Sequence, residues 1–599
     1  MGNNRNFIIA IALSVLVLVV WQVFVANPQV ESARQAAEEA AATQAAQTET
    51  VTPAAPVGAE PAVVAAATPA VCAVTQVTTR EEALVQNPRI AIETPALTGS
   101  INLCGARIDD LRLNHYQETV DPDSPTIVLL SPAQGPLGYY AELGWRRSGA
   151  ALVDAGTLWT APEGAVLTQD APVVLTYDNG AGLVFTRTVA VDEEYMFTVT
   201  DAVTNSTGGD VALTPYGRIT RADQNLSTGF FILHEGMIGF LGDDGLQQVD
   251  YSALTDGPRQ YDSATTGWLG ITDKYWAATL IPEQGQPFIG RFAGSQDQRH
   301  FEADYTGAPR PIANGTTATV TANLFAGAKE VAIVDGYEAA LDIPRFELLI
   351  DWGWFYFITK PMFSVLDWLY RLVGNFGVAI LLVTVILKLI FFPLANRSYR
   401  SMAAMRKFTP QIAALRERHK DDRAKQQQAM LELYRKEKIN PVAGCWPILI
   451  QIPVFFALYK VLFVTLEMRH QPFFGWIQDL SAPDPTSIFN LFGLLPFEPP
   501  AFLGVGIWPV IMGITMWAQF QLNPQTPGTP KWIFNILPLV FTFMLASFPA
   551  GLVIYWAWNN LLSVIQQSVI MKRNGVDVNL FANIRSTFRR KPKDAKAKT

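Results

Sequence analysis

The chain has 599 residues, of which 49% are hydrophobic and 16% charged, with a mean hydropathy of +0.17. It is too long for one hydrophobic core and less charged than a typical soluble domain, which excludes a small soluble single-domain protein. The charge is also divided unevenly, because residues 1–350 carry −22 and residues 351–599 carry +14. This division predicts two parts that lie in two compartments.

The first apolar segment, Phe7–Val25, follows Arg5. It is long enough to span a membrane and longer than the apolar core of a cleaved signal peptide. We therefore expect residues 1–26 to form an uncleaved N-terminal membrane anchor. Residues 27–78 are rich in Ala, Pro and Thr and contain few large apolar side chains, so they are expected to form a flexible linker.

Residues 79–342 have the pattern of an all-β domain. Between Tyr195 and Val203, every second residue falls on one side of an extended strand. Asp178-Asn179-Gly180 marks a turn between two further strand-like runs. Other short runs, including Thr126–Leu130, lie between Gly and Pro residues. The pattern predicts one large antiparallel sandwich.

The three cysteines match no zinc or redox motif. Cys72 and Cys104 lie in the acidic half and could pair if that half is outside the cytoplasm. The position of Cys72 in the linker favours the alternative, that they do not pair. Cys445 lies in an apolar segment and is expected to be a small core residue.

From Trp352 onward the chain becomes aromatic, apolar and basic. Residues 343–376 also carry Lys360, Asp367 and Arg371, a mixture that predicts an amphipathic helix in the membrane interface. Residues 377–572 are expected to form the membrane core. With the anchor, the core gives six expected transmembrane helices, since its five apolar stretches are Gly377–Leu394, Cys445–Leu466, Leu503–Gln521, Trp532–Phe548 and Leu552–Ile570.

Basic residues indicate how this bundle is oriented. Residues 396–440 carry +7, and the tail, residues 573–599, is also basic. The loop from Glu467 to Ala501 has only one basic residue, Arg469. Because basic loops stay in the cytoplasm, we expect both termini to be cytoplasmic and the β domain to be outside.

Residues 396–440 have the pattern of a helical hairpin. Thr409-Pro410 is expected to begin its first helix, and Asp421 or Asp422 to cap its second. Each helix has apolar residues on one face, and the hairpin residues concerned are Ile412, Leu415, Met430, Leu433 and Tyr434.

Lys388 is the most informative residue, because apolar neighbours surround it on both sides. A charge in the membrane costs roughly 2.5–3.5 kcal/mol on insertion scales. The ammonium could extend to the lipid headgroups, or it could face a wet cavity inside the bundle. Thr384 lies on the same helical face and favours the cavity. Polar residues of the other spans could line the cavity or join helices, and these are Gln451, Gln519, Gln521, Asn559, Asn560, Gln566 and Gln567.

The sequence lacks the motifs of several enzyme classes. It contains no P-loop, no H-E-x-x-H and no G-x-S-x-G, and its five histidines are scattered. We therefore expect no enzyme activity, no metal and no cofactor.

Four segments resemble the YidC family of membrane protein insertases. They are WGWFYFITKPMF, FFPLANRSYRSMAAMRKFTPQI, LYRKEKINPVAGCWPILIQIPVFFALY and FPAGLVIYWAWNNLLSVIQQ. The anchor, linker and β domain resemble the Gram-negative form, whose periplasmic domain is a β-supersandwich similar to sugar-binding enzymes. The resemblance implies a bacterial inner-membrane protein in which spans two to six form a groove, open to cytoplasm and lipid but closed outside. The family's usual basic residue in the second span is arginine, and here that position is Lys388.

The resemblance also assigns residues and partners. It implies a substrate groove lined by Lys388, Thr384, Gln451, Tyr555 and Trp556. It implies that the hairpin receives substrate at Pro410, Ile412, Leu415, Met430 and Tyr434. The basic tail, including Arg589, Arg590 and Lys591, is expected to contact the ribosome or lipid. The implied partners are nascent membrane proteins, the Sec translocon with its accessory subunits, the ribosome, the signal-recognition pathway and membrane lipids, but not DNA.

Together these features predict an insertase and chaperone that draws acidic substrate tails into the groove without ATP. One alternative is a solute transporter with a sugar-binding periplasmic domain. A second alternative is an assembly scaffold for membrane complexes.

Overall fold

The computed structural model describes residues 72, 75–222, 233–295, 300–419, 422–436, 446–492, 494, 495, 497, 504–522 and 531–575. The expected anchor, most of the linker and the basic tail with Arg589, Arg590 and Lys591 lie outside these residues. The described chain divides into two compact units. One contains residues 68–482 and 549–555, and the other contains residues 483–548 and 556–599.

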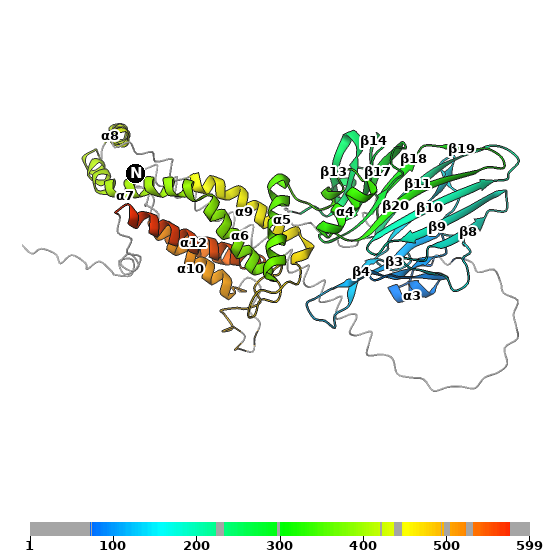
Figure 1. The fold of residues 1–599 in the computed structure, drawn as a ribbon, viewed down its shortest axis with the longest axis horizontal. Helices are drawn as coiled ribbons and strands as arrows, with labels where there is room; N and C mark the ends of the chain where they lie inside the picture. Colours follow the sequence, from blue (N-terminus) through cyan, green and yellow to red (C-terminus); the bar gives the residue numbers. More distant parts are fainter. Residues whose placement is uncertain are drawn as a thin grey trace, which may run out of the picture. The chain divides into compact units, whose positions relative to one another are not determined.

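The β-rich part is built from two sheets (Figure 1). The 12-stranded sheet contains β1 (Arg89–Glu93), β2 (Leu97–Asn102), β3 (Arg107–Gln117), β4 (Thr126–Leu130), β5 (Tyr139–Arg147), β6 (Ala150–Ala151), β7 (Val166–Leu167), β11 (Val211–Ala222), β14 (Arg259–Ala264), β17 (Phe288–Gly294), β18 (His300–Gly307) and β19 (Arg310–Ile312). The 8-stranded sheet contains β8 (Val173–Asp178), β9 (Leu183–Val191), β10 (Met196–Asn205), β12 (Gly236–Leu241), β13 (Gly245–Val249), β15 (Gly267–Thr272), β16 (Trp276–Ile281) and β20 (Thr317–Ala328). Neighbouring strands are antiparallel except for β1 and β7, so the predicted antiparallel sandwich is confirmed.

Strand β10 shows why these residues form a sheet. It pairs with β9 and β20, and its alternate side chains Phe197, Val199 and Val203 are buried, as the sequence period predicts. Asp201 is buried on the same face and forms an ion pair with Arg187 of β9, with Nε 2.7 Å from Oδ1. Arg187 also donates to the carbonyl of Leu143 in the other sheet at 2.6 Å. The ion pair therefore links the two layers.

Cys72 and Cys104 form a disulfide, so the expectation that they do not pair was wrong. The Cα atoms of Cys72 and Cys104 lie 5.7 Å apart. The segment after Cys72 is held against the β domain, since the amide of Val77 donates to the carbonyl of Gln134 at 2.9 Å. A short helix follows, α3 (Arg80–Val85), capped by Thr79. The linker composition concealed this order, because small residues packed against a sheet resemble those of a tether.

The helical part follows β20. Its α-helices are α4 (Val331–Leu341), α5 (Tyr356–Val373), α6 (Phe376–Ile390), α7 (Phe392–Arg418), α8 (Arg423–Lys436), α9 (Trp446–Val464), α10 (Ile507–Leu522), α11 (Lys531–Met544) and α12 (Ala550–Arg573), and its short 3₁₀ turns include η4 (Phe346–Leu349) and η6 (Leu466–Met468). In the described part of the chain, no single helix is both long and apolar enough to cross a membrane. Phe376–Ile390 and Phe392–Met405 meet that requirement as a pair bent by 67°.

The bend between α6 and α7 has a local cause. Phe391 leaves helical geometry with ψ near 3°, and Pro393 stands in the first turn of α7. Proline has no N–H with which to continue the backbone hydrogen bonds of α6 across this point.

The expected helix start at Thr409-Pro410 was wrong, because α7 continues through both residues. A proline inside a helix removes one backbone hydrogen bond but does not always end the helix. Here the buried side chains Tyr399, Ala403 and Ile412 lie along one continuous helix, and this packing outweighs the local signal. The cap of α8 was correctly placed, since Asp422 Oδ1 accepts from the amides of Ala424 and Lys425 at 3.1 Å.

Candidate functional site

Thr384 and Lys388 lie one turn apart on α6, as expected. Asn375 fixes the start of this helix by accepting from the amide of Val378 at 3.0 Å. Thr384 is buried, and its hydroxyl donates to the carbonyl of Ile380 at 2.7 Å. Lys388 stands in the last turn of α6, where a positive charge is favoured by the helix dipole.

Lys388 lies at the boundary between two faces of α6. The buried face carries Ile380, Val383 and Thr384, whereas Leu389 and Ile390 are exposed. Lys388 is half-buried and continues the line of Thr384 along the helix. Its side chain therefore leaves the helix beside the packed face and not from the centre of the exposed face.

Two other predicted groove residues contact each other directly. Gln451 of α9 donates through Nε2 to the hydroxyl of Tyr555 in α12 at 2.8 Å. Tyr555 is fully buried and Gln451 is half-buried. A buried amide and phenol need such partners when the surroundings are apolar. The contact joins α9 and α12, two segments more than one hundred residues apart.

Trp556 has a different environment from Tyr555. Its ring lies 6.0 Å from that of Phe541 in α11, measured between centroids. Adjacent residues of a helix point about 100° apart, so Tyr555 and Trp556 do not share a face. Of the five predicted groove residues, Thr384 and Lys388 lie one turn apart on α6, and Gln451 and Tyr555 are joined by a hydrogen bond. Trp556 packs against the aromatic ring of Phe541.

Helix α12 continues the polar pattern toward its C-terminus. Tyr555, Asn559, Ser563 and Gln567 recur every fourth residue and are all buried. Gln567 donates through Nε2 to the carbonyl of Leu522 at the end of α10, at 3.2 Å. The sequence suggested either a groove lining or a link between helices for these groups, and for Gln567 the structure shows the link.

A second polar link joins α10 to α11. Trp517 Nε1 and Gln521 Nε2 both donate to Asn535 Oδ1, at 3.1 and 2.9 Å. Gln521 was among the polar groups noted in the sequence, but Asn535 was missed because its segment is short and strongly apolar.

The apolar residues of the hairpin differ in how deeply they are buried. Ile412 of α7 is buried, whereas Leu415 of α7 and Met430 and Tyr434 of α8 are half-buried. Pro410 lies within α7. Helices α7 and α8 contact each other, and α7 also packs against α9.

Charged residues near the C-terminal end of α9 form contacts that the sequence did not predict. Lys460 forms an ion pair with Asp351, with Nζ 2.7 Å from Oδ2. Glu467 accepts from the amide of Val331 at 2.8 Å, at the start of α4. Arg469 donates to the carbonyl of Gln117 in β3 at 2.7 Å. These contacts attach α9 and η6 to the β domain. Lys460 satisfies the criterion that singled out Lys388, an ionisable group in an apolar helix, and could have been found by it.

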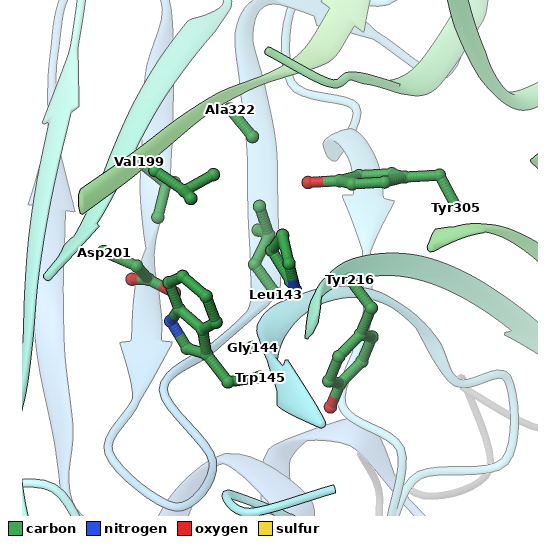
Figure 2. A pocket seen from close by; sticks show the side chains of 10 residues that line it. Leu143, Gly144, Trp145, Val199, Asp201, Tyr216, Tyr305 and Ala322 are labelled. Atoms are coloured by element: carbon green, nitrogen blue, oxygen red, sulfur yellow. The ribbon is translucent and has the colours of Figure 1, made fainter. Parts of the chain in front are cut away.

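The β domain contains a small cavity between its sheets. Figure 2 shows Trp145, Tyr216 and Tyr305 among the side chains that line it, with Asp201 at one side. The only carboxylate in this lining is that of Asp201, which Arg187 already engages through two hydrogen bonds of 2.7 Å. The cavity therefore does not favour the alternative of a sugar-binding transporter. In the described residues, no group of three or more His, Cys, Asp or Glu side chains is arranged to hold a metal.

A large β domain followed by apolar helices with buried polar contacts defines a class, the membrane-associated proteins that carry a large β domain. Family models support both halves of this description. The model of the YidC periplasmic domain matches residues 89–365, and the model of the 60Kd inner membrane protein matches residues 368–576.

Similar proteins identify the family. The chain is 54% identical to the membrane protein insertase YidC of Rhizobium meliloti, over 99% of this chain and 100% of that one. It is 55% identical to the membrane protein insertase YidC of Rhizobium etli, over the full length of both. A crystal structure of an active YidC insertase is similar at 20% identity, with a TM-score of 0.35, over 80% of this chain and 91% of that one. The chain therefore belongs to the YidC family of membrane protein insertases.

Proposed function

We propose that this chain inserts and helps to fold membrane proteins by drawing an acidic substrate tail toward Lys388 in a polar groove. The observation that carries the proposal is the position of Lys388, half-buried at the edge of the packed face of α6 and one turn after Thr384. Gln451 and Tyr555 supply further polar groups for the groove. A charge held beside buried helices acts through a lower dielectric than a surface charge does.

The proposed topology has six transmembrane helices, with both termini in the cytoplasm and the β domain in the periplasm. Bent or short helices are tolerated in a membrane where neighbours or water satisfy the freed backbone groups. The basic residues of α7 and α8 support a cytoplasmic position for the hairpin.

The proposed mechanism needs no nucleotide. A wet groove shortens the apolar path that a charged tail must cross, so the tail keeps part of its hydration. The membrane potential favours movement of a negative charge outward by about 2.3 kcal/mol per 100 mV. The apolar segment behind the tail then leaves the groove for lipid, where its burial provides the remaining free energy.

Helix α5 is proposed to lie in the membrane interface. Its residues Met362, Leu366 and Leu369 are buried, whereas Trp368 and Leu372 are exposed. Lys360 pairs with Asp335 at 3.0 Å and with Glu347, which fixes the helix to the end of the β domain. An exposed apolar face beside a fixed charged edge suits the boundary between lipid and water.

Substrate delivery is proposed to use the cytoplasmic hairpin and the basic tail. Half-buried Leu415, Met430 and Tyr434 offer apolar surface to an emerging nascent chain. Ribosomes, the signal-recognition pathway, lipids and the Sec translocon remain proposed partners, with Arg589, Arg590 and Lys591 as proposed contacts for RNA or anionic lipid.

Lys388 provides the test of this mechanism. Lys388→Glu should reduce insertion of an acidic-tailed substrate about tenfold or more, because charges 4 Å apart at an effective dielectric of ~20 interact by about 4 kcal/mol. Lys388→Arg should retain insertion, and Lys388→Met should give an intermediate result. The measurement is protease protection of the translocated tail in reconstituted vesicles.

The matched control is Arg147→Glu, a charge reversal at an exposed residue of β5 in the β domain. It should leave insertion close to that of the natural chain. A substrate whose tail is neutral should also be much less sensitive to Lys388→Glu. Equal insertion by the Arg and Glu variants at position 388 would disprove the electrostatic step.

A further inference from the structure

The segment that leads into α10 exposes an unusual number of apolar side chains. Figure 1 shows it as a loop before that helix. We call the residues that the structure describes between positions 487 and 505 the apolar lobe. Its exposed side chains are Phe489, Leu491, Phe492, Leu494, Leu495 and Phe497, of which Leu494 is 81% exposed. Glu498 is the only charged residue between positions 485 and 506.

The apolar lobe is fixed to the first turn of α10. Asp484 is buried and accepts from the amide of Trp508 at 2.9 Å, and its other oxygen accepts from the amide of Thr486 at 3.0 Å. The hydroxyl of Thr486 accepts from the amide of Ile507 at 3.0 Å. The two ends of the lobe also meet, since the amide of Ile488 donates to the carbonyl of Val505 at 3.0 Å.

Inside the apolar lobe, backbone amides find acceptors within the lobe itself. The amide of Phe492 donates to the carbonyl of Ser487 at 2.8 Å, and that of Leu495 donates to Asn490 at 3.0 Å. The amide of Phe497 donates to Leu495 at 2.9 Å. A loop can enter an apolar environment only if its backbone groups are satisfied internally, and these bonds reduce that cost.

Helix α10 is too short to cross the hydrocarbon core alone. Its 16 residues span about 24 Å at 1.5 Å per residue, whereas the core is about 30 Å thick. Residues next to the helix must then occupy the remaining depth, and we consider those on its N-terminal side. Those residues are the apolar lobe, whose composition and internal hydrogen bonds suit that position.

We propose that the apolar lobe inserts its exposed side chains into the outer leaflet of the membrane. Lipid is the occupant that fits, because the described residues of the lobe offer apolar and aromatic side chains, and several of their backbone amides bond within the lobe. A surface patch that binds a protein partner usually has a rim of polar residues around its apolar centre. The inference rests on the proposed topology in one respect, that α10 spans the membrane.

The experiment uses the full chain in lipid vesicles, in a Cys445→Ser background that leaves only the disulfide cysteines. Single cysteines at Leu494, Leu491, Ile514 or Val174 carry an environment-sensitive fluorophore. Ile514 is 60% exposed on α10, and Val174 is exposed on β8. Quenchers are nitroxides attached to lipid at shallow or deep positions, and iodide in the external water.

Labels at Leu494→Cys and Leu491→Cys should be quenched by shallow nitroxide and protected from iodide several-fold relative to Val174→Cys. The label at Ile514→Cys should respond to deep nitroxide. Lobe labels that respond to iodide as Val174→Cys does would overturn the proposal, and so would labels protected from both quenchers, which would indicate a protein cover. If only the label at Ile514→Cys is quenched by the nitroxide lipids, the lobe does not enter the membrane, but the proposal that α10 spans it is retained. If Ile514→Cys does not respond to lipid, the proposed topology fails as well.

Discussion

Glu467 shows how a single buried carboxyl can make this protein sensitive to pH. Its Oε1 caps α4 by accepting from Val331, and among the described residues no hydrogen-bond donor reaches its Oε2. Burial raises the pKa of Glu467 to about 7, and the nearby carboxylates of Glu330 and Asp367 add to the rise. The bond from Val331 opposes the rise but does not cancel it.

The sign of the effect follows from the raised pKa. The folded protein holds the Glu467 proton more tightly than the unfolded chain, whose carboxyl has a pKa of 4.5. The stabilisation is complete below that value and is lost as pH rises through about 7. We expect Glu467→Gln, which stays neutral, to reduce the fall in apparent unfolding temperature between about pH 5 and about pH 8.

Differential scanning fluorimetry in detergent at a series of pH values measures this effect. Glu163→Gln, a substitution of an exposed carboxyl in the β domain, is the matched control and should leave the pH dependence unchanged. Identical pH profiles for the natural chain and Glu467→Gln would contradict the assignment.

Individual residues differ in how far the sequence revealed them. Lys388 was evident because its neighbours along the chain are apolar, and this is a local property. The role of Glu467 was not evident from the sequence, because its partner Val331 lies 136 positions away. Gln451 was noted as a polar group in an apolar segment and Tyr555 was named through the family resemblance, but only the folded chain shows that they bind each other.

At the scale of elements, α10 and α11 pack through a glycine. A Cβ atom at Gly513 would lie 2.0 Å from Thr542 Oγ1, a distance that real contacts do not reach. The hydroxyl of Thr542 donates to the carbonyl of Pro538 at 2.8 Å, which holds it in place. The close approach of the two helices therefore depends on the absence of a side chain at position 513.

We expect Gly513→Ala to destabilise the protein by about 1–3 kcal/mol, the usual cost of overpacking. The measurement is thermal unfolding in detergent. Adding Thr542→Ala should recover part of the loss, since the obstructing oxygen is removed. Gly336→Ala in α4, where a Cβ meets open space, is the control and should be neutral or slightly stabilising. A loss of equal size in both glycine variants would refute the packing argument.

Contacts between helices also explain why the predicted helix start at Thr409-Pro410 was wrong. Thr409-Pro410 is a good helix start by local rules, and the sequence pattern gave no reason to continue the helix through it. The contacts of α7 with α8 and α9 are tertiary, and they favour one long helix over two shorter ones.

At the scale of the whole molecule, the disulfide holds the segment at Cys72 against the β domain. Cys72 and Cys104 are separated by 32 positions. In the chain-entropy model a crosslink of this span stabilises the folded state by about 4 kcal/mol. We expect the double variant Cys72→Ser, Cys104→Ser to unfold at lower denaturant concentration than the natural chain.

The natural chain in reductant should show the same decrease, and the double variant should not respond to reductant. Cys445→Ser is the control and should behave as the natural chain. A thiol assay on the denatured, non-reduced protein should detect one free cysteine of the three. Detection of three free thiols would contradict the bond.

The sequence by itself determined the β class of the first half, the apolar character of the second half and Lys388 as a candidate site. These follow from composition, charge, alternation and apolar length, which are properties of neighbouring residues. Tertiary structure alone decided the partners of Glu467, Lys460 and Gln451, the continuity of α7 and the disulfide. Each of these depends on which distant segments meet, and the free energy of such a contact appears only when the chain has folded.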